Sequence, residues 1–202
     1  MFTGIVETPG EVIERTATED GLRLRIAAAG LEDLYHGQSI NVSGVCLTVE
    51  KHGEVETADR QWFEVFLAAE TVAKTYLDEV TEGDRVNVER AMPADGRFDG
   101  HVVQGHVDTV AEVEAIEQVG EDWRFTFSVP EGVEQYVVQK GSVSLDGISL
   151  TVAEKREGAI EVAIIPTTYE LTTLSEKAVG DPVHIEVDVI AKYVENMVDG
   201  YV

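Results

Sequence analysis

Three blocks of this 202-residue sequence occur twice, in the same order. Residues 4–8 resemble 105–109 at an offset of 101 (105 − 4), residues 42–49 resemble 145–152 at an offset of 103 (147 − 44), and residues 71–89 resemble 168–186 at an offset of 97 (180 − 83). Because the offset is nearly constant, the sequence predicts a tandem duplication. The boundary is expected in residues 92–96, which contain Pro, Gly and Asp.

Each copy has the residue pattern of β-structure. Apolar and polar residues alternate in segments 22–26, 124–129, 160–164 and 183–187. Gly- and Asp-containing turns separate these segments, and short strands at close spacing are typical of a sandwich or a barrel. A short helix or turn is expected in residues 70–75 and 168–173, where the alternation stops.

The C-terminal segment has a different periodicity. Ile190, Val194, Met197 and Tyr201 follow one another at spacings of four, three and four residues, which predicts one apolar face of a helix. A helix this short is marginal alone and needs a surface to pack on. Two interpretations stay open: the helix docks on its own domain, or it contacts another subunit.

The formal charge is −24, from 39 acidic and 15 basic residues spread along the chain. Such a chain repels phosphate backbones, so we expect no nucleic-acid partner. A dispersed acidic surface favours a salt-adapted host, with an ordinary acidic mesophilic protein as the alternative. The sequence has no apolar run long enough for a membrane span and no signal peptide at its start. The single cysteine, Cys46, excludes an intrachain disulfide, and we expect a cytoplasmic protein.

The strongest candidate for a binding site is the motif shared by residues 44–48 and 147–151. In a strand, Cys46 and Thr48 point to one face, and so do Ser149 and Thr151. Each copy thus offers two small polar groups beside a glycine, where a flat ring can approach the backbone. The alternative is an ordinary strand after a turn, with Cys46 as a small buried hydrophobe.

Residues 100–106 contain two histidines, His101 and His106, of which His106 stands where the first copy has Ile5. A histidine can donate, accept or shuttle a proton near neutral pH, although a single one is more commonly an ordinary surface or core residue. The sequence has no metal-ligand spacing, phosphate loop or nucleophile elbow, so a metalloenzyme, an NTPase and an α/β-hydrolase are disfavoured.

Motifs along the whole chain resemble the bacterial-type riboflavin synthases. They lie at residues 1–7, 46–49, 83–90, 105–106, 140–141, 146–152 and 165–166. The resemblance implies an all-β fold of two tandem six-stranded Greek-key β-barrels followed by a short C-terminal helix. We accordingly expect a lumazine-binding barrel at 1–96, a second at 97–188, and the helix at 189–202.

The resemblance also implies a reaction and an assembly. Two molecules of 6,7-dimethyl-8-ribityllumazine exchange a four-carbon unit, giving riboflavin and 5-amino-6-(ribitylamino)uracil without cofactor or metal. The family is homotrimeric, with the site between the N-terminal barrel of one subunit and the C-terminal barrel of its neighbour. Facing pockets would hold the two rings in an oriented encounter. An association with lumazine synthase is left open.

The resemblance implies one ligand in each barrel. The expected contacts in the first barrel are Gly4, Ile5, Val6, Cys46, Leu47, Thr48, Phe66, Leu67, Ala68, Ala69, Glu70 and Thr71, with Ser39 as a further contact. Those in the second are Gly105, His106, Val107, Lys140, Ser149, Leu150, Thr151, Ile164, Ile165, Pro166, Thr167, Thr168 and Tyr169.

We expect four residues to matter most for turnover: Cys46, His106, Ser149 and Asp188. Cys46 and Ser149 are equivalent in the repeat but chemically different, His106 aligns with Ile5, and Asp188 aligns with Ala91. Such inequality is what distinct donor and acceptor roles require, so we assign proton handling to this group without fixing which residue acts first.

The chain departs from the family pattern at two points. Ser43-Gly44 stands where Asn-Gly is common, and residues 166–168 read Pro-Thr-Thr where Pro-Glu-Thr is common, which puts a carboxylate role there in doubt. The alternative function is a non-catalytic lumazine- or flavin-binding protein of the same superfamily. Without the resemblance, the sequence would indicate only a binding module of duplicated barrels.

Overall fold

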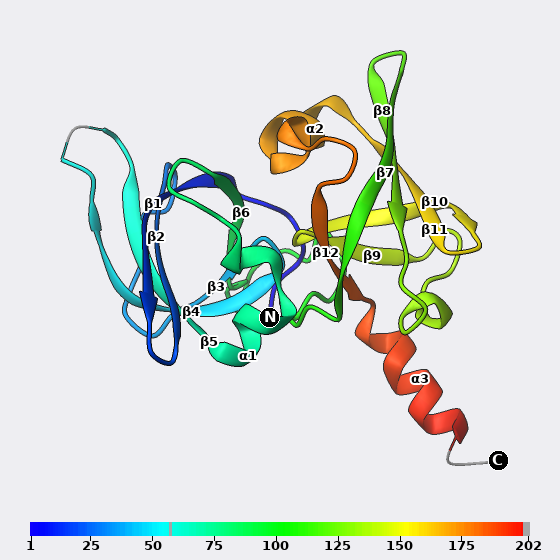
Figure 1. The fold of residues 1–202 in the computed structure, drawn as a ribbon, viewed down its shortest axis with the longest axis horizontal. Helices are drawn as coiled ribbons and strands as arrows, with labels where there is room; N and C mark the ends of the chain where they lie inside the picture. Colours follow the sequence, from blue (N-terminus) through cyan, green and yellow to red (C-terminus); the bar gives the residue numbers. More distant parts are fainter. Residues whose placement is uncertain (57, 200–202) are drawn as a thin grey trace.

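The computed structural model describes residues 1–56 and 58–199 and contains two closed β-barrels that lie side by side (Figure 1). The first consists of β1 (Thr8–Thr18), β2 (Gly21–Ala28), β3 (Ser39–Val42), β4 (Val45–Glu54), β5 (Gln61–Ala68) and β6 (Arg85–Arg90). The second consists of β7 (Thr109–Val119), β8 (Asp122–Ser128), β9 (Ser142–Leu145), β10 (Ile148–Arg156), β11 (Ala159–Ile164) and β12 (Pro182–Val187). The all-β, two-barrel prediction is confirmed.

The two barrels have the same strand order. Around the first it is β1-β2-β5-β4-β3-β6, and the second repeats it six strands later; all neighbours are antiparallel. Each order is a Greek key because β2 lies beside β5, and β8 beside β11, rather than beside the next strand in the chain. Bulges also recur: β1 shifts register after Val12 and β7 after Val113, which are equivalent in the repeat.

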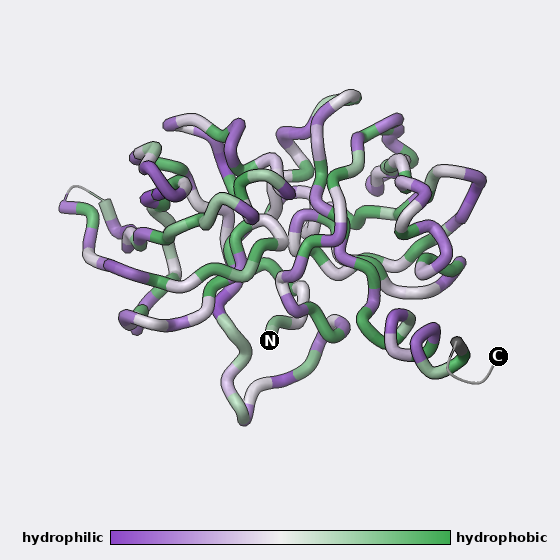
Figure 2. The backbone as a smooth tube through the Cα atoms, turned by 60° about the horizontal axis from the view of Figure 1, so that its bottom comes forward, coloured by the Kyte–Doolittle hydropathy of each residue, from purple (hydrophilic) through white to green (hydrophobic). Residues whose placement is uncertain are grey.

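Each barrel has its own apolar core, built from inward-facing residues that alternate along all six of its strands. Phe63 in the first barrel and Phe125 and Phe127 in the second are fully buried, and burial of each such side chain stabilises the fold by about 2 kcal/mol. Along the tube in Figure 2, apolar and polar segments alternate on the barrel strands, and polar residues gather at the outer loops. The domain limits expected from the sequence place one core in each unit; the limits themselves stay a prediction.

A short helix follows the fifth strand of each barrel, as the sequence predicted. Helix α1 (Ala69–Lys74) continues from β5 and leads into the 3₁₀ turn η1 (Tyr76–Asp78). Helix α2 (Pro166–Leu171) continues from β11 and leads into η3 (Thr173–Glu176). Pro166 starts α2 because proline fits the first helical turn, where its missing N–H is not needed.

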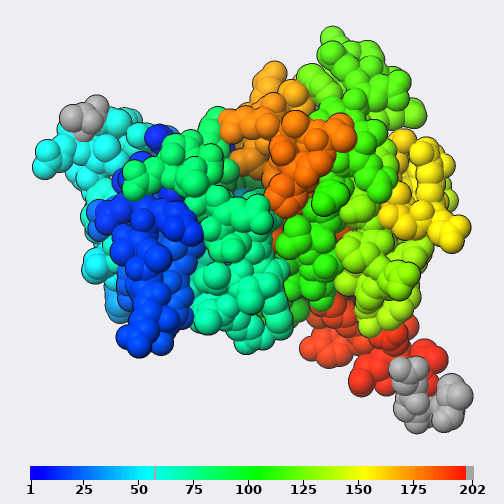
Figure 3. Space-filling view, viewed as in Figure 1, coloured from blue at the N-terminus to red at the C-terminus, as the bar shows by residue number. Residues whose placement is uncertain are grey.

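The C-terminal helix α3 (Val189–Asp199) extends away from the second barrel (Figures 1 and 3). Its base is held by an ion pair between Lys192 and Asp108 (2.6 Å) and by a hydrogen bond from Tyr136, in the 3₁₀ turn η2 (Glu134–Tyr136), to Glu195. Of the predicted apolar stripe, Ile190, Val194 and Met197 are more than half exposed, and Tyr201 lies outside the described residues.

Within the described ranges, no helix has both the length and the apolar character that crossing a membrane requires.

The barrels meet where two hairpin turns touch. The turns are Ser43-Gly44, between β3 and β4, and Asp146-Gly147, between β9 and β10; all four residues have positive φ. A Cβ atom on Gly147 would lie 2.8 Å from the backbone nitrogen of Gly44. The repeat thus generates an approximate two-fold axis whose centre has room only for backbone. We call this contact region the seam.

We expect Gly147→Ala to lower the free energy of unfolding by about 3 kcal/mol or more, because a left-handed alanine is strained and its Cβ meets the other turn. Gly158→Ala is the matched control: Gly158 also has positive φ (70°), but nothing lies within 4 Å of its added Cβ. The control should lose only about 1 kcal/mol. Urea unfolding of both variants checks this, and equal losses would contradict the close approach at the seam.

Candidate active site

Gly4 of the first copy lies against β10 of the second, and Gly105 of the second copy lies against β4 of the first. The Cys46 N–H donates to the carbonyl of Gly105 (2.8 Å), and the Ser149 N–H donates to the carbonyl of Gly4 (2.7 Å). A Cβ atom on Gly105 would lie 2.7 Å from the Cys46 Cβ, and one on Gly4 would lie 2.6 Å from the Ser149 Cβ. Both glycines are required because the segments cross at backbone contact.

The structure places each of these two segments beside a strand of the other copy, unlike the grouping that we expected, and the ligand contacts themselves stay a prediction. Val6 packs against the core of the second barrel, and Val107 packs against the core of the first. We call residues 1–7 the first arm and residues 101–108 the second arm. The first arm lies with Ser149 and the second with Cys46, because the arms are exchanged between the barrels.

The two arms also pair with each other. The Phe2 N–H donates to the Val103 carbonyl (2.7 Å), and the Val103 N–H donates to the Phe2 carbonyl (3.1 Å). Both side chains are fully buried. The two residues are one repeat offset apart (103 − 2 = 101), so the same approximate two-fold axis relates the arms.

A buried carboxylate holds each arm at the point where it crosses. Glu89, on β6, accepts from the Thr3 N–H (2.7 Å), the Thr3 hydroxyl (2.8 Å) and the Gly4 N–H (3.0 Å). Glu186, on β12, accepts from the backbone N–H groups of residues 104–106 at 2.7, 2.8 and 3.0 Å. Burial raises the pKa of both carboxyl groups above the usual value, and the N–H donors offset only part of this rise. Neither residue was among the site residues predicted from the sequence.

Cys46 and Thr48 lie on the same side of β4, as predicted, next to the second arm. Cys46 is half-buried and Thr48 is exposed. Burial raises the pKa of the Cys46 thiol, and a hydrogen bond with Ser39 opposes the rise. Ser39 pairs with Thr48 across β3 and β4, so these three predicted residues form one polar patch.

Ser149 has a histidine partner, and that partner is His101. The Ser149 hydroxyl lies 2.7 Å from His101 Nδ1. The ring is buried, its Nε2 has no protein partner, and burial lowers the pKa of the imidazole, against an opposing effect of Asp188. His106, which we expected to take part in proton handling, is exposed on the second arm beside the first barrel's patch. The sequence contains both histidines, but nothing in it indicates that His101, 48 residues before Ser149, is the one that contacts this serine.

Asp188 lies close enough to His101 for its charge to act on the ring. It also directly precedes the first residue of α3. Its carboxylate accepts from the Ile190 N–H (3.0 Å), and its carbonyl accepts from the Ala191 N–H (2.9 Å). A carboxylate at this position stabilises the first turn of a helix. The predicted asymmetry between Asp188 and Ala91 therefore has a structural component.

Two further segments that we expected to contact ligand lie where the fifth strand of each barrel runs into a short helix. Residues 66–71 run from the end of β5 into α1, and residues 164–169 run from the end of β11 into α2. Tyr169 stacks on Trp123 with 3.8 Å between ring centroids. Glu70 is exposed and pairs with Lys74 (2.7 Å), so its carboxylate faces solvent in the single chain.

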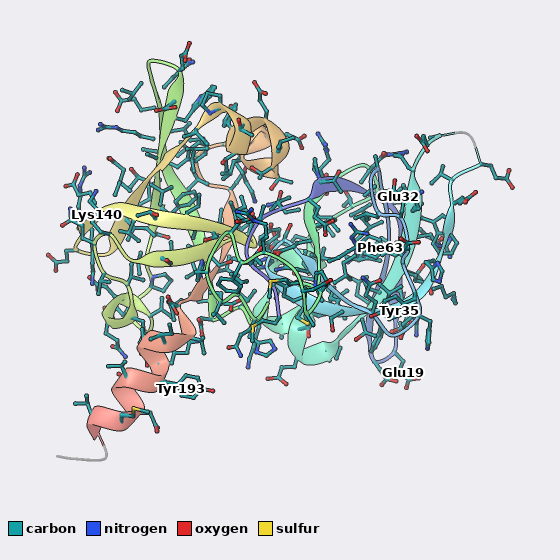
Figure 4. The ribbon with its side chains drawn as sticks, turned by 180° about the vertical axis from the view of Figure 1, so that it is seen from behind. Glu19, Glu32, Tyr35, Phe63, Lys140 and Tyr193 are labelled. Carbon is teal, nitrogen blue, oxygen red and sulfur yellow. The ribbon has the colours of Figure 1, made fainter. Side chains whose placement is uncertain are left out.

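Lys140 has a backbone conformation that a lysine rarely adopts. Its φ is 66°, and its N–H donates to the Val152 carbonyl (2.8 Å). The equivalent residue of the first copy is Gly37, whose N–H donates to the Val49 carbonyl at the same distance. Figure 4 shows Lys140 at the outer part of the second barrel. A strained residue kept where glycine would suffice indicates a role for the side chain.

Both sets of candidate residues form open faces. Thr48, His106, Ile5, Thr151 and Lys140 are all exposed. Gly4, Gly105, Leu47, Leu150 and Ile164 are buried and supply backbone or core. In the single chain each patch therefore has one side exposed to solvent.

Residues 3–91 and 104–188 each match the lumazine binding domain. Over 203 aligned residues the chain is 48% identical to the riboflavin synthase of Mycobacterium bovis, covering 98% of both chains. It is 41% identical to that of Schizosaccharomyces pombe, covering 100% of this chain and 96% of the other, and 39% identical to that of Bacillus subtilis, covering 96% and 87%.

The chain belongs to the riboflavin synthase family.

Solved structures share its fold at lower identity. LumP, crystallised with 6,7-dimethyl-8-(1'-D-ribityl) lumazine, superposes with a TM-score of 0.78 at 22% identity, covering 93% of this chain and 99% of LumP. LumP was also crystallised with riboflavin, at the same TM-score and identity. Proteins with few identical residues therefore share the fold of this chain. The contacts of Glu89 and Glu186 and the crossing of the arms are observed in this chain itself.

We expect Glu186→Gln to destabilise the protein by about 2 to 4 kcal/mol, because glutamine keeps the shape but its amide offers only one acceptor oxygen to three backbone N–H groups. Glu121→Gln, at an exposed turn, is the control and should change stability by less than about 0.5 kcal/mol. Chemical denaturation of both variants provides the measurement. An unchanged Glu186→Gln protein would show that the second arm is held by other contacts.

Proposed function

We propose that this chain is a riboflavin synthase, a transferase that converts two molecules of 6,7-dimethyl-8-ribityllumazine into riboflavin and 5-amino-6-(ribitylamino)uracil. The observation that carries the proposal is the pair of related patches, Cys46 with Thr48 and Ser149 with Thr151, each completed by a crossed arm. Two related patches suit a reaction whose donor and acceptor are the same compound. Together the two products contain all the atoms of two lumazines, so no external oxidant, reductant or cofactor is needed.

In this proposal the ring of each lumazine lies flat on the β4 or β10 strand, beside the glycine of the arm. Lys140 and Thr167 contact the ligand of the second barrel, and Glu70 and Thr71 contact that of the first. Holding both rings in place converts a bimolecular encounter into an oriented one.

The four-carbon transfer requires a proton to leave a methyl group of one lumazine, and we assign proton handling to the residues that differ between the patches. In the second barrel these are Ser149 and His101: a neutral buried imidazole can accept a proton through the hydroxyl it contacts. In the first barrel they are Cys46 and His106. Asp188 adjusts the charge near His101, as its effect on the pKa of that ring indicates.

A chromophore-binding protein like LumP is the second candidate, because the fold is shared. The polar residues Cys46, Thr48, Ser149 and Thr151 favour the enzyme, since binding a flat ring alone does not require two unequal proton-handling pairs.

We expect purified, chelator-treated protein to form riboflavin from the lumazine alone in buffer of high salt concentration. Absorbance of the product and consumption of two lumazines for each riboflavin formed provide the measurement. Ser149→Ala should lower kcat by about a hundredfold or more, the range for loss of a positioned proton carrier, while lumazine still binds. Cys46→Ala is its counterpart in the repeat and shows which barrel handles the proton. Tight lumazine binding without turnover would support the chromophore-binding candidate instead.

We further propose that the chain acts as a homotrimer in the cytoplasm of a salt-adapted host. Supporting this, α3 exposes Ile190, Tyr193, Val194 and Met197, and Figure 4 shows Tyr193 projecting from the side of the helix. Val138 extends the apolar surface beside the helix. We retain 1–96 and 97–188 as the lumazine-binding units and 189–202 as the assembly segment, with each open patch covered by a patch of a neighbouring subunit.

We expect the trimer to be stable at about 1 M salt, where the screening length is about 3 Å, and to weaken at low salt, where the charge of −24 makes subunits repel. Light scattering and turnover across a salt series should fall together, because the site needs two subunits. A fully active monomer at molar salt would refute the shared site, and Val194→Asp, on the exposed face of α3, should dissociate the trimer even there.

A further inference from the structure

The seam has the same hydrogen-bond pattern on both sides of the two-fold axis, made by different side chains. The Thr173 N–H donates to Asn87 Oδ1 (2.9 Å), and the Tyr76 N–H donates to His184 Nε2 (3.0 Å). In the repeat, Asn87 corresponds to His184 (184 − 87 = 97) and Tyr76 to Thr173 (173 − 76 = 97). An imidazole therefore does on one side what an amide does on the other.

These contacts fix the protonation state of His184. Its Nδ1 lies 2.6 Å from the Ser43 carbonyl, so it must donate there, and its Nε2 must accept from Tyr76. Only the neutral ring with its proton on Nδ1 can do both. A protonated ring would point a second donor at the Tyr76 N–H, whereas Asn87 has no such alternative state.

The His184 side of the seam also carries a stack that the other side lacks the rings to form. The His184 and Tyr76 rings lie 4.0 Å apart at 13°. Lys177 Nζ lies 4.6 Å from the centroid of the Tyr76 ring and 3.1 Å from Asp146 Oδ2. His184 and Asp146 are almost completely buried, so the stack is shielded from water.

The stack joins the surroundings of both candidate patches. Tyr76 follows α1, whose first residues, Ala69 to Thr71, are among the expected ligand contacts of the first barrel and are called the α1 wall below. The His184 N–H donates to Asp146 Oδ1 (2.8 Å), in the turn that leads into Ser149. On β12, His184 is two residues before Glu186, the residue that holds the second arm.

We propose that His184 and Tyr76 are a positioning pair, which fixes the α1 wall of the first patch relative to the turn that presents Ser149 and does so only while the imidazole is neutral. The proposal rests on the proposed function for its effect on turnover. Neither residue contacts the ligand; they act through α1 and through the Asp146-Gly147 turn.

The charged and titratable groups that face the imidazole are Asp146 from the β9–β10 turn, Lys177 from the loop before β12, and Tyr76 from η1. Burial lowers the pKa of His184, and Asp146 opposes this. Because the folded-state pKa lies below the unfolded value of about 6.5, the ring's contribution to stability is complete above that pH. It is lost as the pH falls below that value toward the folded-state pKa.

The test compares wild type with His184→Asn, which installs the residue that the other side of the seam uses, and with His184→Ala, which removes the acceptor. His52→Asn, an exposed histidine on β4, is the control. Thermal unfolding and kcat are measured between about pH 8 and pH 5 at constant salt. We expect wild type to lose at least about 3 °C more than His184→Asn on acidification, which for a chain of this size corresponds to about 1 kcal/mol.

At pH 8, kcat should fall for His184→Ala with little change in KM, and His184→Asn should recover most of the loss. The ratio of wild-type to His184→Asn kcat should decline only below about pH 6.5, as the pH approaches the lowered folded-state pKa of His184, and the His52→Asn ratio should stay constant. Identical pH profiles for wild type and His184→Asn would overturn the proposal. The unfolding comparison needs no turnover, so it decides the pair even if the wild type made no riboflavin.

Discussion

The two crossed backbone hydrogen bonds, from Cys46 to Gly105 and from Ser149 to Gly4, are the contacts on which the rest of the structure depends. Each satisfies a strand N–H that would otherwise lack a partner, and such buried groups are costly to leave unpaired. Because both partners come from the opposite copy, neither patch is complete without the other barrel. The seam glycines, the paired arms and the buried carboxylates all follow from the need to hold this crossing.

An approximate two-fold axis gives two equivalent environments, and the chain then makes them unequal with few substitutions. Across the axis, Cys46 corresponds to Ser149, Ile5 to His106, Gly37 to Lys140, and Asn87 to His184. At the Cys46/Ser149 and Gly37/Lys140 positions the backbone hydrogen bonds are the same in both copies, whereas the Ile5 N–H donates to the Thr3 hydroxyl and the His106 N–H donates to Glu186. Geometry is thus conserved between the halves while charge, acidity and reach differ, which is what a reaction between two identical molecules in different roles requires.

Local periodicity and similarity between the copies predicted the duplication, a sandwich or barrel of short strands, a short helix or turn after β5 and β11, and the start of α3. The resemblance to the family was needed to predict two six-stranded barrels. It did not predict the exchange of the arms. A repeat alignment is identical whether each arm lies on its own barrel or on the other, since the two arrangements use the same residues.

The missed site residues have a related cause. Glu89 and Glu186 lie near the ends of strands that have an ordinary alternating pattern. Nothing in that pattern indicates that their carboxylates bind an arm more than 80 residues away. His101 was passed over for His106, five residues later, because only the fold determines which ring meets Ser149. Contacts across the two-fold axis are long-range in sequence, so local pattern carries no trace of them.

The crossing also orders events during synthesis of the chain. The second arm meets β4 across 59 residues (105 − 46), but the first arm must wait for a partner 145 residues further on (149 − 4). Val6 and the rest of that arm therefore leave the ribosome long before the strand that receives them exists. Such distant contacts slow folding and leave apolar surface uncovered meanwhile. The first barrel therefore emerges incomplete, because its N-terminal segment packs against a domain that has not yet been synthesised.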